Sequence, residues 1–303
     1  RGGDTGLVRM TPAFSAVIVI HDSARELEAL LASLRHLPEA PQLVVVDAGS
    51  RDRGAALASE HGAEVVPRPD NPGFGPASNA GVERARAEVT VLLNPDIELR
   101  DAALAELAAR AAGRDALLAP RLLEADGSLQ RTAHPVPGRL DALLPALVHP
   151  PLLPPGARLH AEPWRAEAPR EVGWVIAACL AARTDVLRRL GPFDPNAFLF
   201  YEDLDLCLRA RAAGVPTELH PDLVLRHRGA HATGPTFGGE PHELLARRRR
   251  EVIEARLGRR ALALDDAAQA LTFATRTAGR RLLRRDASRP RAQMRALRRA
   301  RSG

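Results

Sequence analysis

The sequence of 303 residues contains no lysine, only two cysteines and few aromatic side chains, which make up 3% of the chain. Cys179 and Cys207 lie in apolar contexts without the spacing of metal ligands, so we expect no disulfide framework. No apolar run reaches the roughly 18 residues that span a bilayer, and the N-terminus does not resemble a secretory leader. These absences favour a cytoplasmic globular protein.

The positive charge is confined to the C-terminal part of the chain. Residues 1–239 carry 25 arginines and 30 acidic residues, a balance of −5, whereas residues 240–303 carry 18 arginines and 7 acidic residues, a balance of +11. All 43 basic residues are arginine, and an Ala-, Arg- and Pro-rich chain without lysine reflects a GC-rich genome more readily than a functional choice.

Short apolar runs alternate with amphipathic segments over the first 112 residues. Buried strands are predicted at 15–20, 42–47, 63–67 and 89–93, and helices at 24–36, 52–61, 76–87 and 101–112. This alternation predicts an α/β fold with a mostly parallel sheet flanked by helices. Ligands of such sheets bind beyond the carboxyl ends of the strands.

The remainder of the chain is less regular. We expect a hairpin at 121–131, a long Pro-rich loop at 135–169, strands at 171–182, 217–219 and 223–225, helices at 184–190 and from about 202, and a helical extension from 240 whose last dozen residues are disordered.

Polar side chains follow the predicted strands at their carboxyl ends: Asp22, Asp47, Asn94 and Asp96. Asp47 is suited to accept hydrogen bonds from a nucleobase or ribose, although Asp47 or Ser50 could merely cap the next helix. Asp96 offers oxygen ligands for Mg²⁺ or Mn²⁺ bound to a diphosphate, although Asn94-Pro95-Asp96 is also a good plain turn.

Two further motifs carry candidate residues. NPGFGPASNAG (71–81) places Gly73 and Gly75 where the backbone can approach a ligand closely, with Asn79 on the following helix. YEDLDL (201–206) places Glu202, Asp203 and Asp205 at a helix start, which suits either helix capping or a general base. His227 follows an apolar stretch and is either a structural histidine or a fourth site element.

In order and spacing these motifs resemble the inverting glycosyltransferases of family 2, which have the GT-A fold, and most of all their rhamnosyltransferase-like branch. The resemblance covers roughly residues 14–235. Its landmarks are VIVIHDSARELEALLASL (17–34), VVVDAGSRD (44–52), NPGFGPASNAG (71–81), LLNPD (92–96), LLEADGSLQRTAHPVPG (122–138), VGWVIAACLAARTDVLRRLGPFD (172–194), FLFYEDLDLCLRARAAG (198–214) and LRHRGAHATG (225–234).

The resemblance implies a role for each candidate residue. Asp203 would be the base that deprotonates the acceptor hydroxyl, with Glu202 beside it, and Asp96 and His227 would hold Mg²⁺ or Mn²⁺. The nucleotide-sugar side would comprise Asp22, Asp47, Gly73, Gly75, Asn79 and Asn94, and the acceptor side Trp174 and Asp205. The chain departs from the family pattern at His21-Asp22, at Ala48 and at Ala177, where a glycine is common.

By the same resemblance, residues 1–13 form a tail, 14–239 a GT-A domain with a donor half (14–120) and an acceptor half (121–239), and 240–303 a basic extension. The expected reaction transfers rhamnose or a similar hexose from a nucleoside-diphosphate sugar to a glycan or polyprenyl-linked acceptor, in cell-wall or polysaccharide synthesis. The alternatives are a nucleotidyltransferase that forms sugar nucleotides and a non-catalytic membrane scaffold. HDSARE (21–26) does not fit the Gly-rich basic loop of the former.

Residues 262–285 can form a helix with an apolar face and an arginine-rich C-terminal end. The apolar face comprises Leu264, Ala267, Leu271, Ala274 and Leu282. Such a helix suits docking on an anionic membrane, at its inner face, or packing on the catalytic domain. A nucleic-acid partner is not expected, because the extension has one aromatic in this helix, Phe273, and no recognised binding motif.

Overall fold

The computed structural model describes residues 13–195, 199–228 and 240–302, so most of the predicted tail 1–13 and part of the last landmark lie outside it. The first part of the chain alternates strands and helices as predicted. Its elements are β1 (Ser15–Ile20), α1 (Ala24–Leu34), β2 (Gln42–Asp47), α2 (Gly54–Glu60), β3 (Glu64–Pro67), α3 (Phe74–Arg84), β4 (Val89–Leu93), β5 (Ile97–Glu98) and α4 (Ala103–Ala112).

The second part contributes strands with parallel and antiparallel pairings, short helices and a long helical end. Its elements are β6 (Leu117–Leu123), β7 (Ala133–His134), η1 (Leu140–Ala142), α5 (Leu143–Leu147), η2 (Pro150–Leu152), α6 (Pro155–Ala161), η3 (Pro163–Arg165), β8 (Arg170–Val172), β9 (Trp174–Val175), β10 (Cys179–Arg183), α7 (Thr184–Leu190), α8 (Glu202–Ala212), β11 (Thr217–His227), α10 (His242–Leu282) and α11 (Ser288–Ser302).

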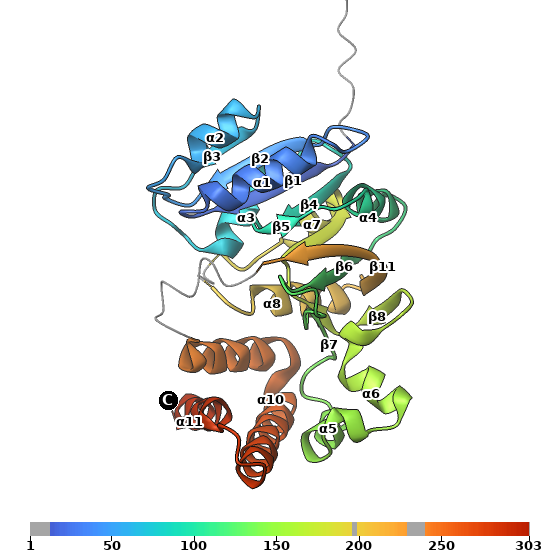
Figure 1. Ribbon diagram of the computed structural model, residues 1–303, viewed down its shortest axis with the longest axis vertical. Helices are drawn as coiled ribbons and strands as arrows, with labels where there is room; N and C mark the ends of the chain where they lie inside the picture. The colour runs from blue at the N-terminus through green and yellow to red at the C-terminus, as the bar shows by residue number, and fades with distance from the viewer. Residues whose placement is uncertain (1–12, 196–198, 229–239, 303) are drawn as a thin grey trace, which may run out of the picture.

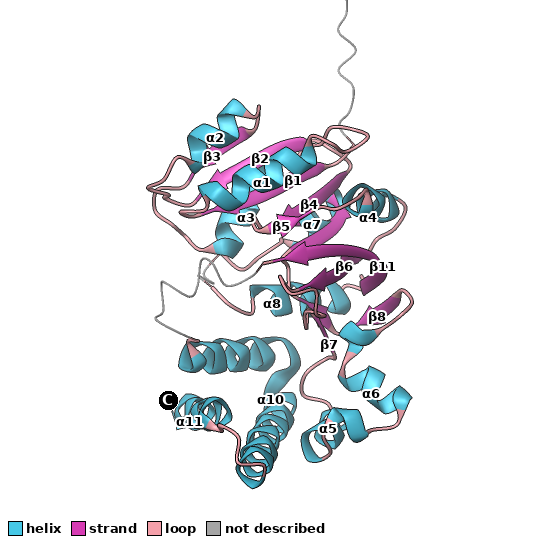
Figure 2. Ribbon diagram, in the orientation of Figure 1, coloured by secondary structure: helices cyan, strands magenta, loops and turns pink. Residues whose placement is uncertain are grey.

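The strands form one large sheet of order β3-β2-β1-β4-β10-β6-β11-β5, with β8 paired to β11 and a separate β7-β9 pair. Strands β1 to β4 are mutually parallel, and β10 enters antiparallel beside β4. The register sets Ile20 opposite Asp47 and Ile18 opposite Leu93, so β1, β2 and β4 end at one edge. Helices cover both faces (Figures 1 and 2). The predicted mixed α/β fold is confirmed.

Strand β1 shows why the sheet is buried on both sides. Ile18 packs into a core cluster with Leu30 of α1, whereas Val17 packs into a second cluster with Val82 of α3. Successive side chains of a strand point to opposite faces, so a continuous apolar run fills both clusters. Gly81 lets α3 approach closely, because an added Cβ would lie 2.3 Å from Val17 Cγ1.

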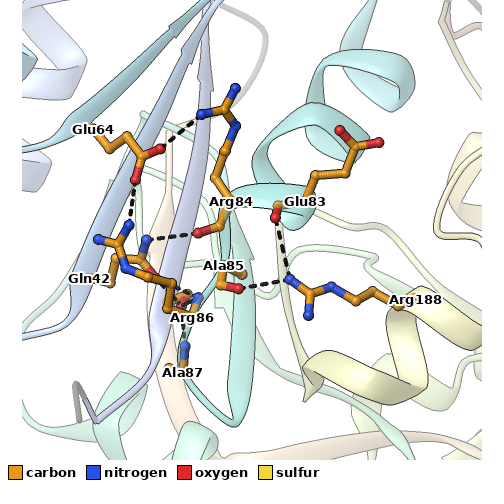
Figure 3. Close-up of polar contacts among 9 residues, drawn as sticks. Gln42, Glu64, Glu83, Arg84, Ala85, Arg86, Ala87 and Arg188 are labelled. Atoms are coloured by element: carbon orange, nitrogen blue, oxygen red, sulfur yellow. Dashed lines mark hydrogen bonds and ion pairs between the residues drawn. The ribbon is translucent and has the colours of Figure 1, made fainter.

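The end of α3 is held by side chains from other elements, as Figure 3 shows. Arg188 of α7 donates from Nη2 to the carbonyls of Val82, Glu83 and Ala85, the last at 2.8 Å. Gln42 of β2 donates to the carbonyl of Arg84 at 2.9 Å. These donors bind the carbonyls at the end of α3, of which that of Val82 also accepts the Ala85 N–H. The loop that leads from α3 into β4 is thereby fixed.

Three sequence predictions for the second part are wrong. Residues 135–169 contain short helices rather than one long loop, and proline occupies the first turn of η2, α6 and η3, where its missing N–H costs nothing. The predicted strand 171–182 is split, because Gly173 lies against the Val136 backbone. The last dozen residues belong to α11, which packs against α10 through the buried Ala296 and Leu297.

The strands predicted at 217–219 and 223–225 form one strand, β11, with a register shift between His220 and Val224. The C-terminal helix α10 changes direction at Gly258, whose φ of 83° is left-handed. Figure 1 shows its two arms running in different directions. Within the described ranges, no helix is both long and apolar enough to cross a membrane.

Candidate active site

Two carboxylates at the carboxyl ends of β1 and β2 accept hydrogen bonds from the loop before α2. Asp22 follows β1 with a left-handed φ of 50°, and its Oδ1 accepts the Arg51 backbone N–H at 2.7 Å. This hydrogen bond, aided by the Arg51 guanidinium, lowers the pKa of Asp22. Asp47 ends β2, and its Oδ1 accepts the Ser50 N–H at 2.9 Å. Both acids therefore shape the loop at 48–52.

The carboxyl end of β4 leads into a turn that places Asn94 and Asp96 beside His227. Strand β5 pairs with the end of β11, with Ile97 opposite His227. His227 Nε2 lies 3.2 Å from Asp96 Oδ1 and 3.3 Å from Asn94 Nδ2. The side chains of Asp96 and His227 are only 10% and 11% exposed. Three predicted site residues thus meet although 133 positions separate Asn94 from His227.

Gln130 completes this cluster and was not predicted from the sequence. Its Oε1 lies 3.0 Å from His227 Nδ1, and its N–H donates to the Leu122 carbonyl at the base of the predicted hairpin. When His227 carries its proton on Nδ1 and donates it to Gln130 Oε1, the lone pair on Nε2 faces Asp96. The Asp126-Gly127 turn was a signal for the hairpin, but nothing in the sequence indicated which returning side chain would reach His227.

The donor atoms of Asp96 and His227 fit a divalent cation. A carboxylate oxygen and an imidazole lone pair facing each other at 3.2 Å repel, unless a proton or a cation lies between them. Magnesium and manganese sites that bind phosphate use one or two carboxylates and take the remaining ligands from substrate and water. No group of three or more His, Cys, Asp or Glu side chains in the described residues forms a metal cluster. The pair is therefore an open, partial set.

Glu202 and Asp203 begin α8 directly after two residues with left-handed backbone, Phe200 and Tyr201. Asp203 accepts the Leu204 N–H at 2.7 Å and the Ala177 N–H at 3.4 Å. Burial raises the pKa of both acids, and the charge of Asp203 raises the pKa of Glu202 further. Two adjacent carboxyls in such surroundings resist double ionisation, so one proton is retained on the pair.

Short contacts connect this acid pair to the Asp96 cluster. Strand β10 pairs with β4, with Cys179 opposite Leu93, and the Asn94 N–H donates to the Ala178 carbonyl at 2.9 Å. The next residue back, Ala177, donates to Asp203. The two groups are therefore linked through Ala177 and Ala178 at one edge of the sheet. The alanine that replaces a common family glycine at 177 still supplies its backbone N–H.

Comparison with known proteins indicates a family. The sequence model described as Glycosyl transferase family 2 matches residues 15–142. With the relatives below, this match supports a glycosyltransferase of family 2. The chain is 27% identical over 243 residues to the N-acetylglucosaminyl-diphospho-decaprenol L-rhamnosyltransferase of Mycobacterium tuberculosis, which covers 74% of this chain and 79% of that protein.

Two further proteins are similar to this chain. The low-salt glycan biosynthesis hexosyltransferase Agl10 of Haloferax volcanii is 24% identical over 68% of this chain and 64% of that protein. The mannosyltransferase of Pyrobaculum calidifontis, solved in complex with GDP-Man and Mn²⁺, matches with a TM-score of 0.58 and 14% identity over 96% of this chain and 86% of that chain. The last likeness shows the GT-A fold.

The remaining donor-side candidates of the glycosyltransferase have mainly structural contacts. Gly73 precedes α3 with a φ of 93°. Gly75 lies against the second half of the chain, because an added Cβ would be 3.0 Å from Phe193 Cβ and 3.6 Å from Glu202 Cβ. Asn79 binds the backbone of Phe193 through both ends of its amide, at 2.8 and 3.0 Å. Their contact with a donor stays a prediction.

The acceptor-side candidates differ in their surroundings. Trp174 stacks on His134 with 4.3 Å between ring centres and lies 6.0 Å from the Tyr201 ring. Asp205 is buried and forms ion pairs with Arg209 at 2.8 Å and Arg256 at 2.6 Å. Trp174 therefore adjoins the segment that carries Asp203, whereas Asp205 ties α8 to α10.

A cavity of about 510 Å³ lies between α3, α7, α8 and α10, and Asn79, Asp205 and Arg256 are among its lining residues. None of Asp96, Asp203 and His227 lines it. The predicted site residues at the sheet edge described above therefore lie outside this cavity.

The C-terminal extension contributes a residue to the surroundings of the acid pair. Arg248 of α10 lowers the pKa of Glu202 by its charge, although burial and Asp203 dominate in the opposite direction. Its Nε is buried without a partner, as is Glu202 Oε2. One buried donor, Arg248 Nε, and one buried acceptor, Glu202 Oε2, therefore both lack a hydrogen-bond partner near the predicted base, Asp203.

Proposed function

We propose that the enzyme is an inverting transferase that moves a hexose from a nucleoside-diphosphate sugar to the hydroxyl of a glycan or lipid-linked acceptor. The contact series from Asp203 through Ala177 and Ala178 to Asn94 carries the proposal, since it brings a basic carboxylate and a cation-binding pair to one sheet edge. The match to the family model favours this activity over nucleotidyl transfer and over a scaffold without catalysis.

Asp203 is the proposed base. Burial raises its pKa toward neutral pH, which makes the carboxylate a stronger proton acceptor than an exposed aspartate. The N–H groups of Ala177 and Leu204 orient the carboxylate toward the acceptor hydroxyl. Glu202 retains the proton that the pair shares, so that Asp203 carries the charge. Attack of the deprotonated oxygen on the anomeric carbon, opposite the leaving group, inverts that centre in one displacement.

Asp96 and His227 are the proposed protein ligands of Mg²⁺ or Mn²⁺, with Asn94 beside them and Gln130 fixing the His227 ring. A bound divalent ion would neutralise the charge that develops on the departing nucleoside diphosphate. Asp22 and Asp47 hold the loop at 48–52 in the position where the nucleoside of a donor would bind. Mn²⁺ in the Pyrobaculum calidifontis mannosyltransferase supports this assignment.

The donor is proposed to carry rhamnose or a similar hexose, and the acceptor to be linked to a polyprenyl diphosphate. The support is the similarity to the mycobacterial rhamnosyltransferase, whose name specifies a decaprenol-linked substrate. Such an acceptor requires the enzyme to work at the inner face of the membrane, with the basic helix at 262–285 as the proposed contact. Asp203 and Trp174 would then lie on the acceptor side.

A donor-hydrolysis assay tests the proposal. Each nucleotide sugar of a small panel is incubated with the enzyme in Mg²⁺, Mn²⁺ or a chelator, and free nucleoside diphosphate is quantified. We expect release that depends on the metal and falls about 10²–10⁴-fold in Asp203→Asn, the usual contribution of a general base. Release that persists unchanged in the chelator and in Asp203→Asn would refute the assigned roles.

A further inference from the structure

The exposed large apolar side chains are concentrated on two segments. Of the seven that the described residues expose, six are leucines of the stretch from η1 to η2 or of the end of α10. Leu282 is 85% exposed and Leu152 is 78% exposed. The six are Leu140, Leu144, Leu147, Leu152, Leu282 and Leu283. Single exposed leucines need no explanation, but such a concentration marks an interaction site.

The two segments adjoin in the fold. Thr275 of α10 donates from Oγ1 to the Ala146 carbonyl of α5 at 2.9 Å, and α5 packs along this arm of the helix. Leu282 follows Thr275 by two helical turns, about 10 Å along the axis. Figure 1 shows α5 and the end of α10 at the extremity of the molecule remote from β1, β2 and β3.

Arginines surround the leucine pair of α10. The sequence RRLLRR (280–285) places two exposed arginines on each side of Leu282 and Leu283, and no acidic residue lies between Asp266 and Asp286. On the other segment Asp141 forms an ion pair with Arg139 at 3.0 Å and lies 3.0 Å from His160 Nε2. Arg280 donates to the Asp286 carbonyl at 2.9 Å, and no ion pair is found for the four arginines of 280–285 among the described residues. Exposed leucines flanked by such arginines favour the boundary of an anionic bilayer over an uncharged apolar partner.

We propose that residues 140–152 and 280–285 form a lipid-docking surface, with leucines that enter the head-group boundary and arginines that bind anionic head groups. This surface rests on the membrane contact proposed above, but places the contact at 140–152 and 280–285 instead of along the whole helix at 262–285. The helix face at 262–274 is unsuited to lipid, because Leu262 is buried and Leu264 and Leu271 are half-buried against the protein. The end of α10 and the short helices beside it remain exposed.

Co-sedimentation with vesicles tests this surface, using the full chain without any sugar substrate. Vesicles of phosphatidylcholine alone are compared with vesicles that contain phosphatidylglycerol in equal amount. We expect binding to the anionic vesicles that weakens as salt is raised, since salt screens the arginines. Leu282→Asp with Leu283→Asp should reduce the binding at least tenfold, and Leu144→Asp with Leu147→Asp should reduce it likewise.

Matched controls separate the surface from general effects of charge. Leu129→Asp changes the one exposed leucine that the described residues place outside the surface, and should leave vesicle binding unchanged. Replacing four arginines of the surface with glutamine should abolish the preference for anionic lipid, whereas the same change at four exposed arginines of the first half should not. The two sets are Arg280, Arg281, Arg284 and Arg285, and Arg25, Arg35, Arg53 and Arg100.

Two outcomes would overturn the proposal. One is equal vesicle binding by the wild type and by the leucine double variants. The other is a dimeric mass in solution that Leu282→Asp with Leu283→Asp converts to monomer, without vesicle binding by either form, which would make the surface a contact between two copies of this chain. Because no substrate enters these measurements, their failure is distinct from a failure of the transferase assay.

Discussion

Arg249 lies over the ring of Tyr201, with 5.6 Å between its guanidinium carbon and the ring centre, and binds Asp265 through two hydrogen bonds of 2.7 and 2.9 Å. Tyr201 directly precedes Glu202 and Asp203 and has a left-handed φ of 62°. The Arg249–Asp265 ion pair is therefore in contact with the residue that orients the start of α8. Strained backbone at such a place persists only when its surroundings hold it.

Arg249→Met is expected to destabilise the protein by about 3–5 kcal/mol, because Asp265 would be left as a buried carboxylate without its partner. Urea unfolding measures the loss. Asp265→Leu added to Arg249→Met should restore most of the stability. If Arg249 also positions Tyr201, the double variant will stay low in kcat with an unchanged KM for the donor. Full recovery of kcat would limit the pair to a structural role.

The rate of transfer is expected to fall on acidification at a pH above the ordinary aspartate pKa of about 3.9. The reason is that the base must be ionised, and burial raises the pKa of Asp203. A profile of kcat/KM against pH shows the descent, and circular dichroism at each pH confirms that the fold is intact. An acidic limb at or below pH 4 would contradict the assignment of Asp203 as the base.

Glu202 is expected to make the protein less stable as the pH rises. Its folded-state pKa is raised by burial and by Asp203 above the unfolded value of about 4.3, so the folded chain binds more protons than the unfolded chain between the two values. The free energy of unfolding is then greatest below the unfolded pKa and declines through the folded one. Glu202→Gln should flatten this decline in melting curves; an equally steep decline would assign it to other groups.

Gln130→Leu is expected to weaken Mn²⁺ binding about 10–100-fold, because His227 would lose the partner that fixes its ring, while both protein ligands stay in place. Electron paramagnetic resonance of a Mn²⁺ titration measures the affinity in the presence of nucleoside diphosphate, with no turnover needed. Gln293→Leu, a matched change in α11 and outside the cluster, is the comparison variant. Equal affinity in Gln130→Leu and wild type would show that Gln130 does not support the ligand.

Gly81→Ala is expected to destabilise the protein by about 1–3 kcal/mol, since the added methyl would lie 2.3 Å from Val17 Cγ1 in a packed core. Gly113→Ala is the matched control, because no atom lies within 4 Å of the added carbon. Chemical denaturation of the two variants makes the comparison. A stability of Gly81→Ala within 0.5 kcal/mol of wild type, roughly the scatter of neutral surface changes, would mean that the helix shifts freely on the sheet.

The parallel half of the fold was predictable because its signals are local. Strands β1, β2 and β4 have the predicted bounds, as each is an apolar run that both faces of the sheet bury. The prolines of 135–169 are typical of a loop, but proline also begins helices, and here it begins η2, α6 and η3. The motifs allowed Asp96 and His227 to be predicted as site residues, and the two side chains lie together. Gln130 and Arg249 could not be predicted, because their contacts with His227 and Tyr201 depend on tertiary structure and not on sequence spacing.

The bend of α10 at Gly258 affects which residues the catalytic unit needs. Asp205 of α8 pairs with Arg256 before the bend, and Asp265 beyond the bend pairs with Arg249 before it, so the first arm is fastened to α8 and the second arm to the first. A chain cut after residue 239 would strip Asp205 of one counterion and Tyr201 of its cation. We therefore expect the smallest autonomous catalytic unit to extend well past residues 15–142, which match the family model, and to include the second arm of that helix.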